Sequence, residues 1–240
     1  MSSASRGGHL KSETGKVKAR THCIRCGECC IQSSPTLQVQ DLRLIEDGVL
    51  ARQDLYAIRK GEMVWDNVIG TLIITREEMI KVREREEGGC IFYEDADKAC
   101  KIHEKPPAQC SAMACWDPVR FMKVYRKPKL TRKDAIKNPA LSGLVRVHES
   151  RCNYEGMERL VKRIEMDGDK AVEAIIQMLR FDNRLRPYIS QKFDLGLQEM
   201  DFIFGRPMTD TIVMFGLKVE RRPDGIFYLT TLPEKAGSKT

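Results

Sequence analysis

The chain has 240 residues, enough for one large core or two modest domains, and its 42% hydrophobic and 31% charged residues suit a soluble globular protein. Its net charge of +7 is too small by itself to indicate a nucleic-acid partner. No apolar run approaches the roughly 20 residues of a membrane span, and the first residues contain no apolar signal segment, so we expect a cytoplasmic protein without a membrane partner.

Residues 1–21 are polar, basic and rich in Ser and Gly, which predicts a flexible arm. A cysteine-rich domain is predicted next, over residues 22–118. The odd number of cysteines, nine in all, the length of the chain and the missing export signal argue against a disulfide scaffold. Clustered thiols in a reducing compartment indicate metal or redox chemistry instead.

Short elements are predicted within the cysteine-rich domain. Asp41 is placed to cap a helix that ends near Gly48, and Asp54 to start a second helix that Gly61 stops. The segment MVWDNVIGTLII, residues 63–74, is rich in β-branched and aromatic residues and predicts one or two strands.

A charged helix is predicted next. Thr75-Arg76-Glu77-Glu78 has the form of a capping box, S/T-x-x-E, and the helix would run to about Glu87. Gly88-Gly89 would end it and deliver the chain to Cys90.

Residues 119–153 are predicted to be a basic linker, with loop-like structure over 120–150 around Pro128 and Pro139. Within it, residues 120–137 contain eight basic side chains and one acidic one. Such a segment can dock nucleic acid or an acidic protein, but a solvated basic loop is the simpler interpretation. We expect a protein redox or substrate partner rather than nucleic acid.

The last part of the chain, residues 154–240, is predicted to be a helical extension with a β-hairpin. Apolar residues recur at helical spacing over 157–164 and 171–179. Near the end, two β-rich runs flank the turn sequence Arg222-Pro223-Asp224-Gly225. The fold class is therefore α+β: an irregular, metal-stabilised cysteine-rich domain followed by helices and a C-terminal β-hairpin.

The densest motif, HCIRCGECC at residues 22–30, places four thiols within eight residues. Cys23, Cys26 and Cys29 match the first three ligands of the ferredoxin run C-x₂-C-x₂-C-x₃-C-P. The fourth position is Ser33, so a plain two-cluster ferredoxin is excluded. The later cysteine spacings of nine, nine and four residues do not fit a zinc ribbon either.

Neighbouring side chains point in different directions on a strand or a helix, so Cys29 and Cys30 are expected to serve different groups of ligands. Cys29 would complete a set with Cys23 and Cys26, and Cys30 would face the later cysteines. The candidate metal ligands are Cys23, Cys26, Cys29, Cys30, Cys90, Cys100, Cys110 and Cys115. Cys152 lies outside this pattern and is expected to be a buried core thiol.

As a whole the pattern resembles the CxxCxxCC proteins, often labelled YkgJ-like and described as zinc- or iron-chelating. CIRCGECC carries the resemblance, together with GGCIFYEDADKACKIHEKPPAQC, in which His103 stands where the family usually has Tyr. The resemblance covers about residues 22–118. A related cysteine cluster occurs in flagellin lysine N-methylases, so it also suggests a cluster-dependent protein N-methylase as an alternative.

Thiolate ligands suit both iron–sulfur clusters and zinc. The cubane-like spacing, the tight turn allowed by Gly27 and the all-cysteine ligand set favour an iron–sulfur cluster, of the 4Fe–4S type, in one or two copies. Structural zinc is the alternative, and the protein would then be a zinc-stabilised interaction module. No catalytic residues can be assigned from the sequence, and whether the protein is an enzyme stays open.

Overall fold

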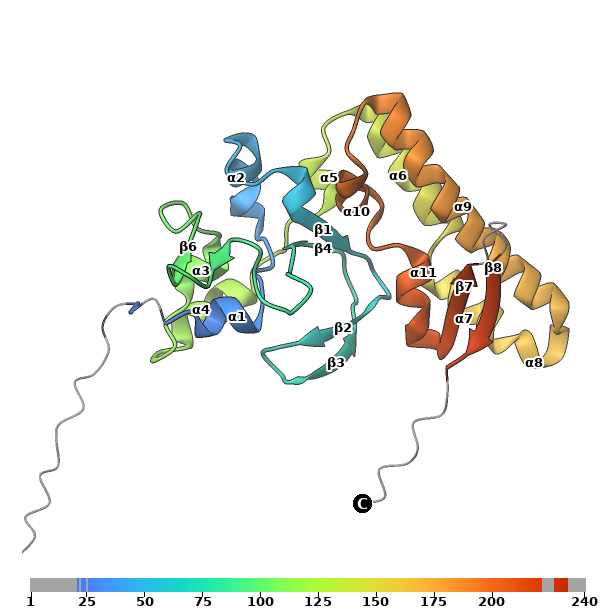
Figure 1. Ribbon diagram of the computed structural model, residues 1–240, viewed down its shortest axis with the longest axis horizontal. Helices are drawn as coiled ribbons and strands as arrows, with labels where there is room; N and C mark the ends of the chain where they lie inside the picture. The colour runs from blue at the N-terminus through green and yellow to red at the C-terminus, as the bar shows by residue number, and fades with distance from the viewer. Residues whose placement is uncertain (1–20, 22, 25, 222–226, 233–240) are drawn as a thin grey trace, which may run out of the picture.

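The computed structural model describes residues 21, 23–24, 26–221 and 227–232 (Figure 1). Its helices and short antiparallel hairpins confirm the α+β class, with the cysteine-rich region first, then helices, then a C-terminal β-hairpin. The expected basic arm lies outside the described residues apart from residue 21, and so does the expected turn at 222–225.

The described strands form four separate two-stranded antiparallel sheets. They are β1 (Leu55–Ile58), β2 (Met63–Asp66), β3 (Thr71–Ile74), β4 (Met79–Val82), β5 (Tyr93–Glu94), β6 (Ala99–Cys100), β7 (Leu217–Arg221) and β8 (Phe227–Thr231). β1 pairs with β4, β2 with β3, β5 with β6 and β7 with β8. The strands expected within 63–74 and the C-terminal hairpin are therefore confirmed.

Helices in the first part of the chain are short and those in the second part are long. The first group comprises α1 (Glu28–Gln32), η1 (Val39–Asp41), α2 (Leu42–Glu46), η2 (Arg52–Asp54), α3 (Ala108–Ala112), α4 (Val119–Tyr125) and α5 (Arg132–Ala135). The second comprises α6 (Pro139–Arg151), α7 (Tyr154–Lys162), α8 (Ile164–Asp167), α9 (Asp169–Phe193), η3 (Leu197–Glu199), α10 (Met200–Phe204), α11 (Met208–Thr211) and η4 (Ile212–Phe215). In Figure 1, α1 to α4 lie on the left and α6 to α9 on the right, with β1, β4, α5 and α10 between them.

The helix expected to start at Asp54 is wrong. Asp54 instead closes the single 3₁₀ turn η2, where its carboxylate accepts a hydrogen bond from the Ala51 N–H at 2.8 Å. The following residues form β1, in which Leu55 and Ala57 are fully buried and pair with Val82 and Ile80. Pairing with a distant strand overrides the local helical spacing.

The charged helix expected over 76–87 is also wrong. Its central residues form β4, whose buried Ile80 and Val82 alternate with partly exposed neighbours, the period of a strand. The Thr75 hydroxyl does not cap a helix but donates to the Arg59 carbonyl oxygen at 2.7 Å. Residues 75–78 match the capping-box pattern, but the residues that follow pair with β1 as a strand, so no helix forms there.

The loop-like structure expected over 120–150 is wrong as well, because α4, α5 and α6 occupy most of it. The prolines bound these helices rather than disrupt them. Pro139 is the first residue of α6, where a proline costs no hydrogen bond, and the Asn138 side chain accepts from the Leu141 N–H at 3.1 Å as the N-cap.

Two hydrophobic clusters hold the chain together. The first combines Leu55 and Ile80 of the β1–β4 pair with Phe202 and Phe204 of α10, and it includes Cys90. The second packs α7 and α9 against β7 and β8, and it includes the fully buried Cys152. The expectation that Cys152 is a core thiol is confirmed, and residues near 200 complete the core on which Cys90 sits.

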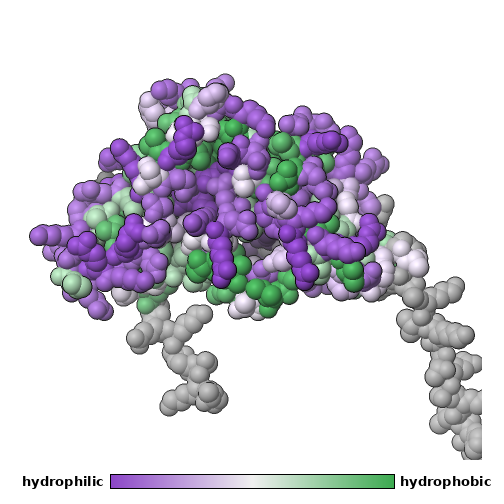
Figure 2. Space-filling model, turned by 180° about the vertical axis from the view of Figure 1, so that it is seen from behind, coloured by the Kyte–Doolittle hydropathy of each residue, from purple (hydrophilic) through white to green (hydrophobic). Residues whose placement is uncertain are grey.

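One apolar surface remains outside both clusters. On β2 and β3, Trp65 and Leu72 are opposite each other in register and are 58% and 57% exposed, and Ile74 is 52% exposed. Figure 2 shows hydrophobic side chains gathered along the lower edge of that view, where this hairpin lies. None of the described helices is long and apolar enough to cross a bilayer.

Candidate metal centre

The first cysteines are positioned by a turn at Gly27. Gly27 has φ +83°, a backbone conformation that residues with a side chain rarely adopt, and it serves as the N-cap of α1. Its carbonyl oxygen accepts hydrogen bonds from the N–H groups of Cys30 and Ile31 at 2.8 and 2.9 Å. This turn carries Cys29 and Cys30 into the first turn of α1 directly after Cys26.

A second chain segment joins α1 through its backbone. The Cys90 N–H donates to the Cys30 carbonyl oxygen at 2.7 Å. Gly89, with φ +81°, lies so close that a Cβ atom there would stand 2.8 Å from the Cys30 oxygen and 2.7 Å from the Ile31 oxygen. Only glycine fits this approach, which brings residues 60 positions apart into direct contact.

Cys100 and Cys110 reach the same region from two further elements. Cys100 lies on β6, directly opposite Tyr93 of β5. Cys110 lies on α3, whose first N–H, that of Ala108, donates to an Asp41 carboxylate oxygen at 2.8 Å. The next residue of α3, Gln109, accepts from the Thr36 N–H at 2.9 Å. These bonds anchor α3 to the segment that follows α1.

Five thiols are near enough for the charge on one to alter the pKa of another: Cys29, Cys30, Cys90, Cys100 and Cys110. A hydrogen bond from the Cys30 thiol lowers the pKa of Cys29 to about 6, and the same interaction raises the pKa of Cys30. The protein atoms around Cys90 and Cys110 raise the pKa of both thiols by desolvation, and charge on Cys100 raises both further. The five thiols share one electrostatic environment.

Cys29 and Cys30 do not diverge as expected, because their Sγ atoms are 3.9 Å apart. Two thiolates at 2.3 Å from one tetrahedral zinc ion would be roughly 3.8 Å apart, so one ion could take both. Within the described residues, no three His, Cys, Asp or Glu side chains stand in an arrangement that could hold a metal ion as they are placed.

The remaining candidate ligands lie on the surface. Cys23 and Cys26 are exposed ahead of α1, and Cys115 is exposed after α3. None of the nine cysteines, all of which are among the described residues, takes part in a disulfide.

The sequence interpretation missed Tyr93 and the role of Gly89. The Tyr93 side chain is 5% exposed and lies over Gly27, where an added Cβ atom would meet the Tyr93 Oη at 2.1 Å. The sequence predicts that Gly88-Gly89 ends a helix, whereas in the structure Gly89 permits the backbone contact with Cys30. A glycine next to a candidate ligand could have signalled such an approach.

A buried charged network, also unforeseen, links the residue that follows β1, Arg59, to α6 and α9. The fully buried His148 of α6 donates through Nε2 to Asp182 of α9 at 2.8 Å, while its Nδ1 accepts from Arg59 at 3.3 Å. The Nε–H of Arg186, one turn later on α9, also donates to the Asp182 carboxylate, at 3.1 Å. Asp182 and Arg186 are spaced i, i+4, and this spacing was the signal available in the sequence.

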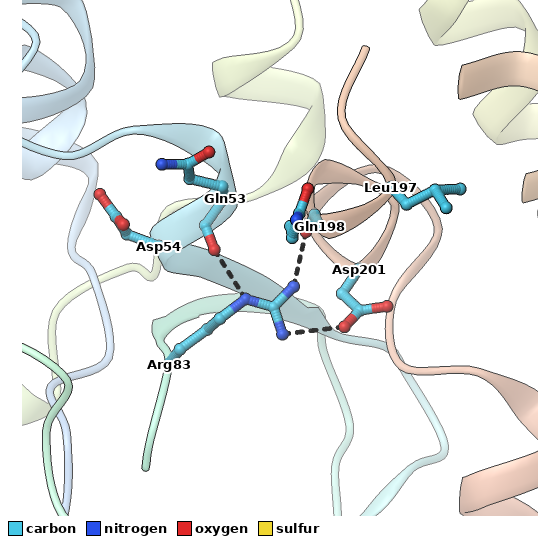
Figure 3. Close-up of a pocket in the computed structure, with 6 residues that line it drawn as sticks. All are labelled: Gln53, Asp54, Arg83, Leu197, Gln198 and Asp201. Atoms are coloured by element: carbon cyan, nitrogen blue, oxygen red, sulfur yellow. Dashed lines mark hydrogen bonds and ion pairs between the residues drawn. The ribbon is translucent and has the colours of Figure 1, made fainter. Parts of the chain in front are cut away.

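An open groove lies between the end of β4 and the η3–α10 segment (Figure 3). The Arg83 guanidinium occupies it and donates to the carbonyl oxygens of Gln53 and Gln198 at 2.7 and 2.6 Å. The same side chain pairs with Asp201 at 2.9 Å. Because Arg83 already binds these three groups of its own chain, we interpret the groove as a contact between chain segments and not as a ligand site.

The basic segment 120–137 is partly used by the fold. The Lys129 amine bonds the Tyr125 carbonyl oxygen and lies 4.8 Å from the centre of that ring. Arg132 is 2% exposed and is paired with Glu78 and Glu149. These two cations are therefore not displayed to a partner.

One family of known proteins resembles a segment of the chain. Residues 22–138 match the model of the CxxCxxCC family, whose description is "Putative zinc- or iron-chelating domain". The match confirms the resemblance drawn from the cysteine spacing, extends it from residue 118 to 138, and includes every cysteine except Cys152. No curated protein and no solved structure matches the chain.

Proposed function

We propose that residues 22–138, the segment that matches the zinc- or iron-chelating CxxCxxCC family, form a cysteine metal centre that holds an iron–sulfur cluster of the 4Fe–4S type. The observation that carries the proposal is the junction between Cys30 and the Gly89–Cys90 segment, which joins thiols from distant parts of the chain. The protein would act as a redox or electron-transfer module, or as an accessory to one.

The residues present fit such a group. Every candidate donor is a sulfur atom, the ligand type that iron–sulfur clusters and zinc share. The pKa values of Cys30, Cys90 and Cys110 are raised, and a bound cation would favour the thiolate forms of these side chains. Ligands would come from the five neighbouring thiols, Cys29, Cys30, Cys90, Cys100 and Cys110, and further ligands from the exposed Cys23, Cys26 and Cys115. A bound cluster would supply one-electron transfer.

Iron and zinc are each supported by a different observation. The spacing of Cys23, Cys26 and Cys29 is that of a cubane site, which supports iron. The 3.9 Å between the Cys29 and Cys30 sulfurs is close to the edge of a zinc–thiolate tetrahedron, which supports zinc as the second candidate. With zinc, the centre would stabilise an interaction module rather than transfer electrons.

Metal analysis of anaerobically purified protein tests the proposal. We expect a brown protein that contains iron and acid-labile sulfide and gives an EPR signal after reduction with dithionite. A colourless protein that contains stoichiometric zinc would show that the centre holds zinc and not an iron–sulfur cluster. Protein that takes up neither metal after anaerobic reconstitution would contradict the chelating function itself.

Location and partners follow from the same proposal. A reducing cytoplasm would keep the thiols available for metal, and a protein redox or substrate partner would exchange electrons with the centre. The protein N-methylase alternative gains no observation from the described part of the chain.

A further inference from the structure

Tyr93 lies where the two cysteine segments meet. It belongs to β5, pairs with Cys100 of β6, and follows Cys90 by three residues. Its side chain is 5% exposed. A tyrosine in this position contacts the elements that carry both the early and the later cysteines.

The hydroxyl end of Tyr93 points at the turn that carries the first thiols. A Cβ atom at Gly27 would be 2.1 Å from the Tyr93 Oη and 2.5 Å from its Cζ. Gly27 directly follows Cys26 and is the N-cap of α1, which holds Cys30. Desolvation and the charges of Asp95, Cys30 and Cys26 raise the pKa of the Tyr93 hydroxyl.

The ring itself is held from the side of the second segment. The Arg85 guanidinium lies 5.9 Å from the centre of the Tyr93 ring. The backbone N–H of Arg85 donates to the Gly89 carbonyl oxygen at 2.9 Å. A phenylalanine ring would keep this packing. What tyrosine adds is one hydroxyl, which is protonated at neutral pH and can donate to a thiolate.

We propose that the Tyr93 hydroxyl donates a hydrogen bond to a ligand sulfur of the metal centre, that of Cys26 or Cys30. The inference rests on the proposed chelating function and makes Tyr93 a positioning residue. Donors to ligating sulfur orient the ligand and hold negative charge on it, and losing such a partner costs metal affinity.

The test compares wild type, Tyr93→Phe and the control Tyr188→Phe, whose tyrosine on α9 is 56% exposed and belongs to the other end of the molecule. Affinity for Zn²⁺ is measured by competition with a chromophoric chelator. We expect Tyr93→Phe to bind about 10- to 100-fold more weakly, and Tyr188→Phe to bind like wild type. Denaturation of each metal-free protein shows whether the variants fold equally well.

Co²⁺ in place of zinc gives a readout that packing alone would not move. The sulfur-to-cobalt charge-transfer band should shift to lower energy in Tyr93→Phe, because a sulfur without the hydrogen bond gives up charge more easily. If Tyr93→Phe does not fold, 3-fluorotyrosine at position 93 keeps the ring and makes a stronger donor, and the band should then shift to higher energy.

The outcomes separate the two proposals. If wild type binds neither Zn²⁺ nor Co²⁺, the chelating function fails and the inference fails with it. If wild type binds both and Tyr93→Phe matches it in affinity and spectrum, or the fluorinated protein shows no shift, only the inference is overturned.

Discussion

The backbone N–H of Cys90 donates to the carbonyl oxygen of Cys30 across 2.7 Å, so the backbone itself joins two candidate ligands. Gly89 permits the contact because any side chain there would collide with the carbonyl oxygens of Cys30 and Ile31. Backbone packing therefore brings together the segments that carry Cys30 and Cys90.

Replacing Gly89 tests this junction. Gly89→Ala should destabilise the fold and weaken metal binding, because the new Cβ meets backbone oxygens that cannot move aside. Gly88→Ala is the matched control: φ is also positive, at +92°, but its Cβ would meet nothing within 4 Å. We expect Gly89→Ala to cost about 1–3 kcal/mol more than Gly88→Ala in urea denaturation. Equal costs would show that the contact with Cys30 is unimportant.

Single cysteine substitutions test the ligand set. Alanine at Cys29, Cys90 or Cys110 should abolish stoichiometric metal uptake, because each removes a thiol of the shared group. Cys152→Ala should keep full uptake and lose about 1 kcal/mol of stability, since its sulfur is buried in the second hydrophobic cluster. The metal content per chain, measured by mass spectrometry, shows which of these cysteines are ligands. Full loading of the Cys110 variant would remove it from the set.

The exposed thiols ahead of α1 form a separate prediction. Alanine at Cys23 or Cys26 should also prevent loading if the cubane-like spacing is used. Loss of iron with retention of zinc in these two variants would show that iron needs Cys23 and Cys26, whereas zinc is held by the five neighbouring thiols. Unchanged iron loading in both variants would show that they are not ligands.

Asp182 should make stability fall in acid. Its burial acts to raise the pKa, but the hydrogen bond from His148 and the charge of Arg186 outweigh it and lower the pKa of Asp182 to about 2. A carboxylate with a lowered pKa stabilises the fold fully above the unfolded value, about 4, and this contribution is lost as the pH falls from 4 toward 2. Urea midpoints measured between pH 7 and pH 2.5 should show this loss.

Asp182→Asn should remove that pH dependence and cost about 3–5 kcal/mol at neutral pH, because Arg186 loses a buried partner. The exposed Asp47→Asn serves as the control and should change the midpoint little. An Asp182→Asn protein as stable as wild type at pH 7 would contradict the role assigned to the network.

Charge reversal in the basic segment should separate folding from binding. Lys129→Glu should destabilise the protein by about 1–3 kcal/mol, because a carboxylate would replace the amine that bonds the Tyr125 carbonyl oxygen. The exposed Lys127→Glu should be nearly neutral. We expect wild type to bind RNA and DNA only weakly. Tight, salt-sensitive binding that Lys127→Glu abolishes would instead make this segment a nucleic-acid surface.

Some features could be read from the sequence because they depend on residue type and short spacing. The thiol density around Cys26 indicated metal chemistry, and the β-rich runs near the C-terminus indicated a hairpin. The short helix expected after Asp41 is present as α2, but Asp41 does not cap it: its carboxylate accepts from the N–H groups of Gln38 and Ala108 instead. Cys152, outside the spacing, was correctly assigned to the core.

Other features depend on partners far along the chain. Residues 76–87 have helical charge patterning, yet Ile80 and Val82 become a strand because Leu55 and Ala57 are there to pair with them. Cys30 meets Cys90 only because Gly89 lets two backbones touch, and Tyr93 reaches Gly27 through the same packing. The sequence alone determined which atoms could bind a metal. Tertiary structure decided which of them meet, because long-range backbone pairing and burial outweigh local preference.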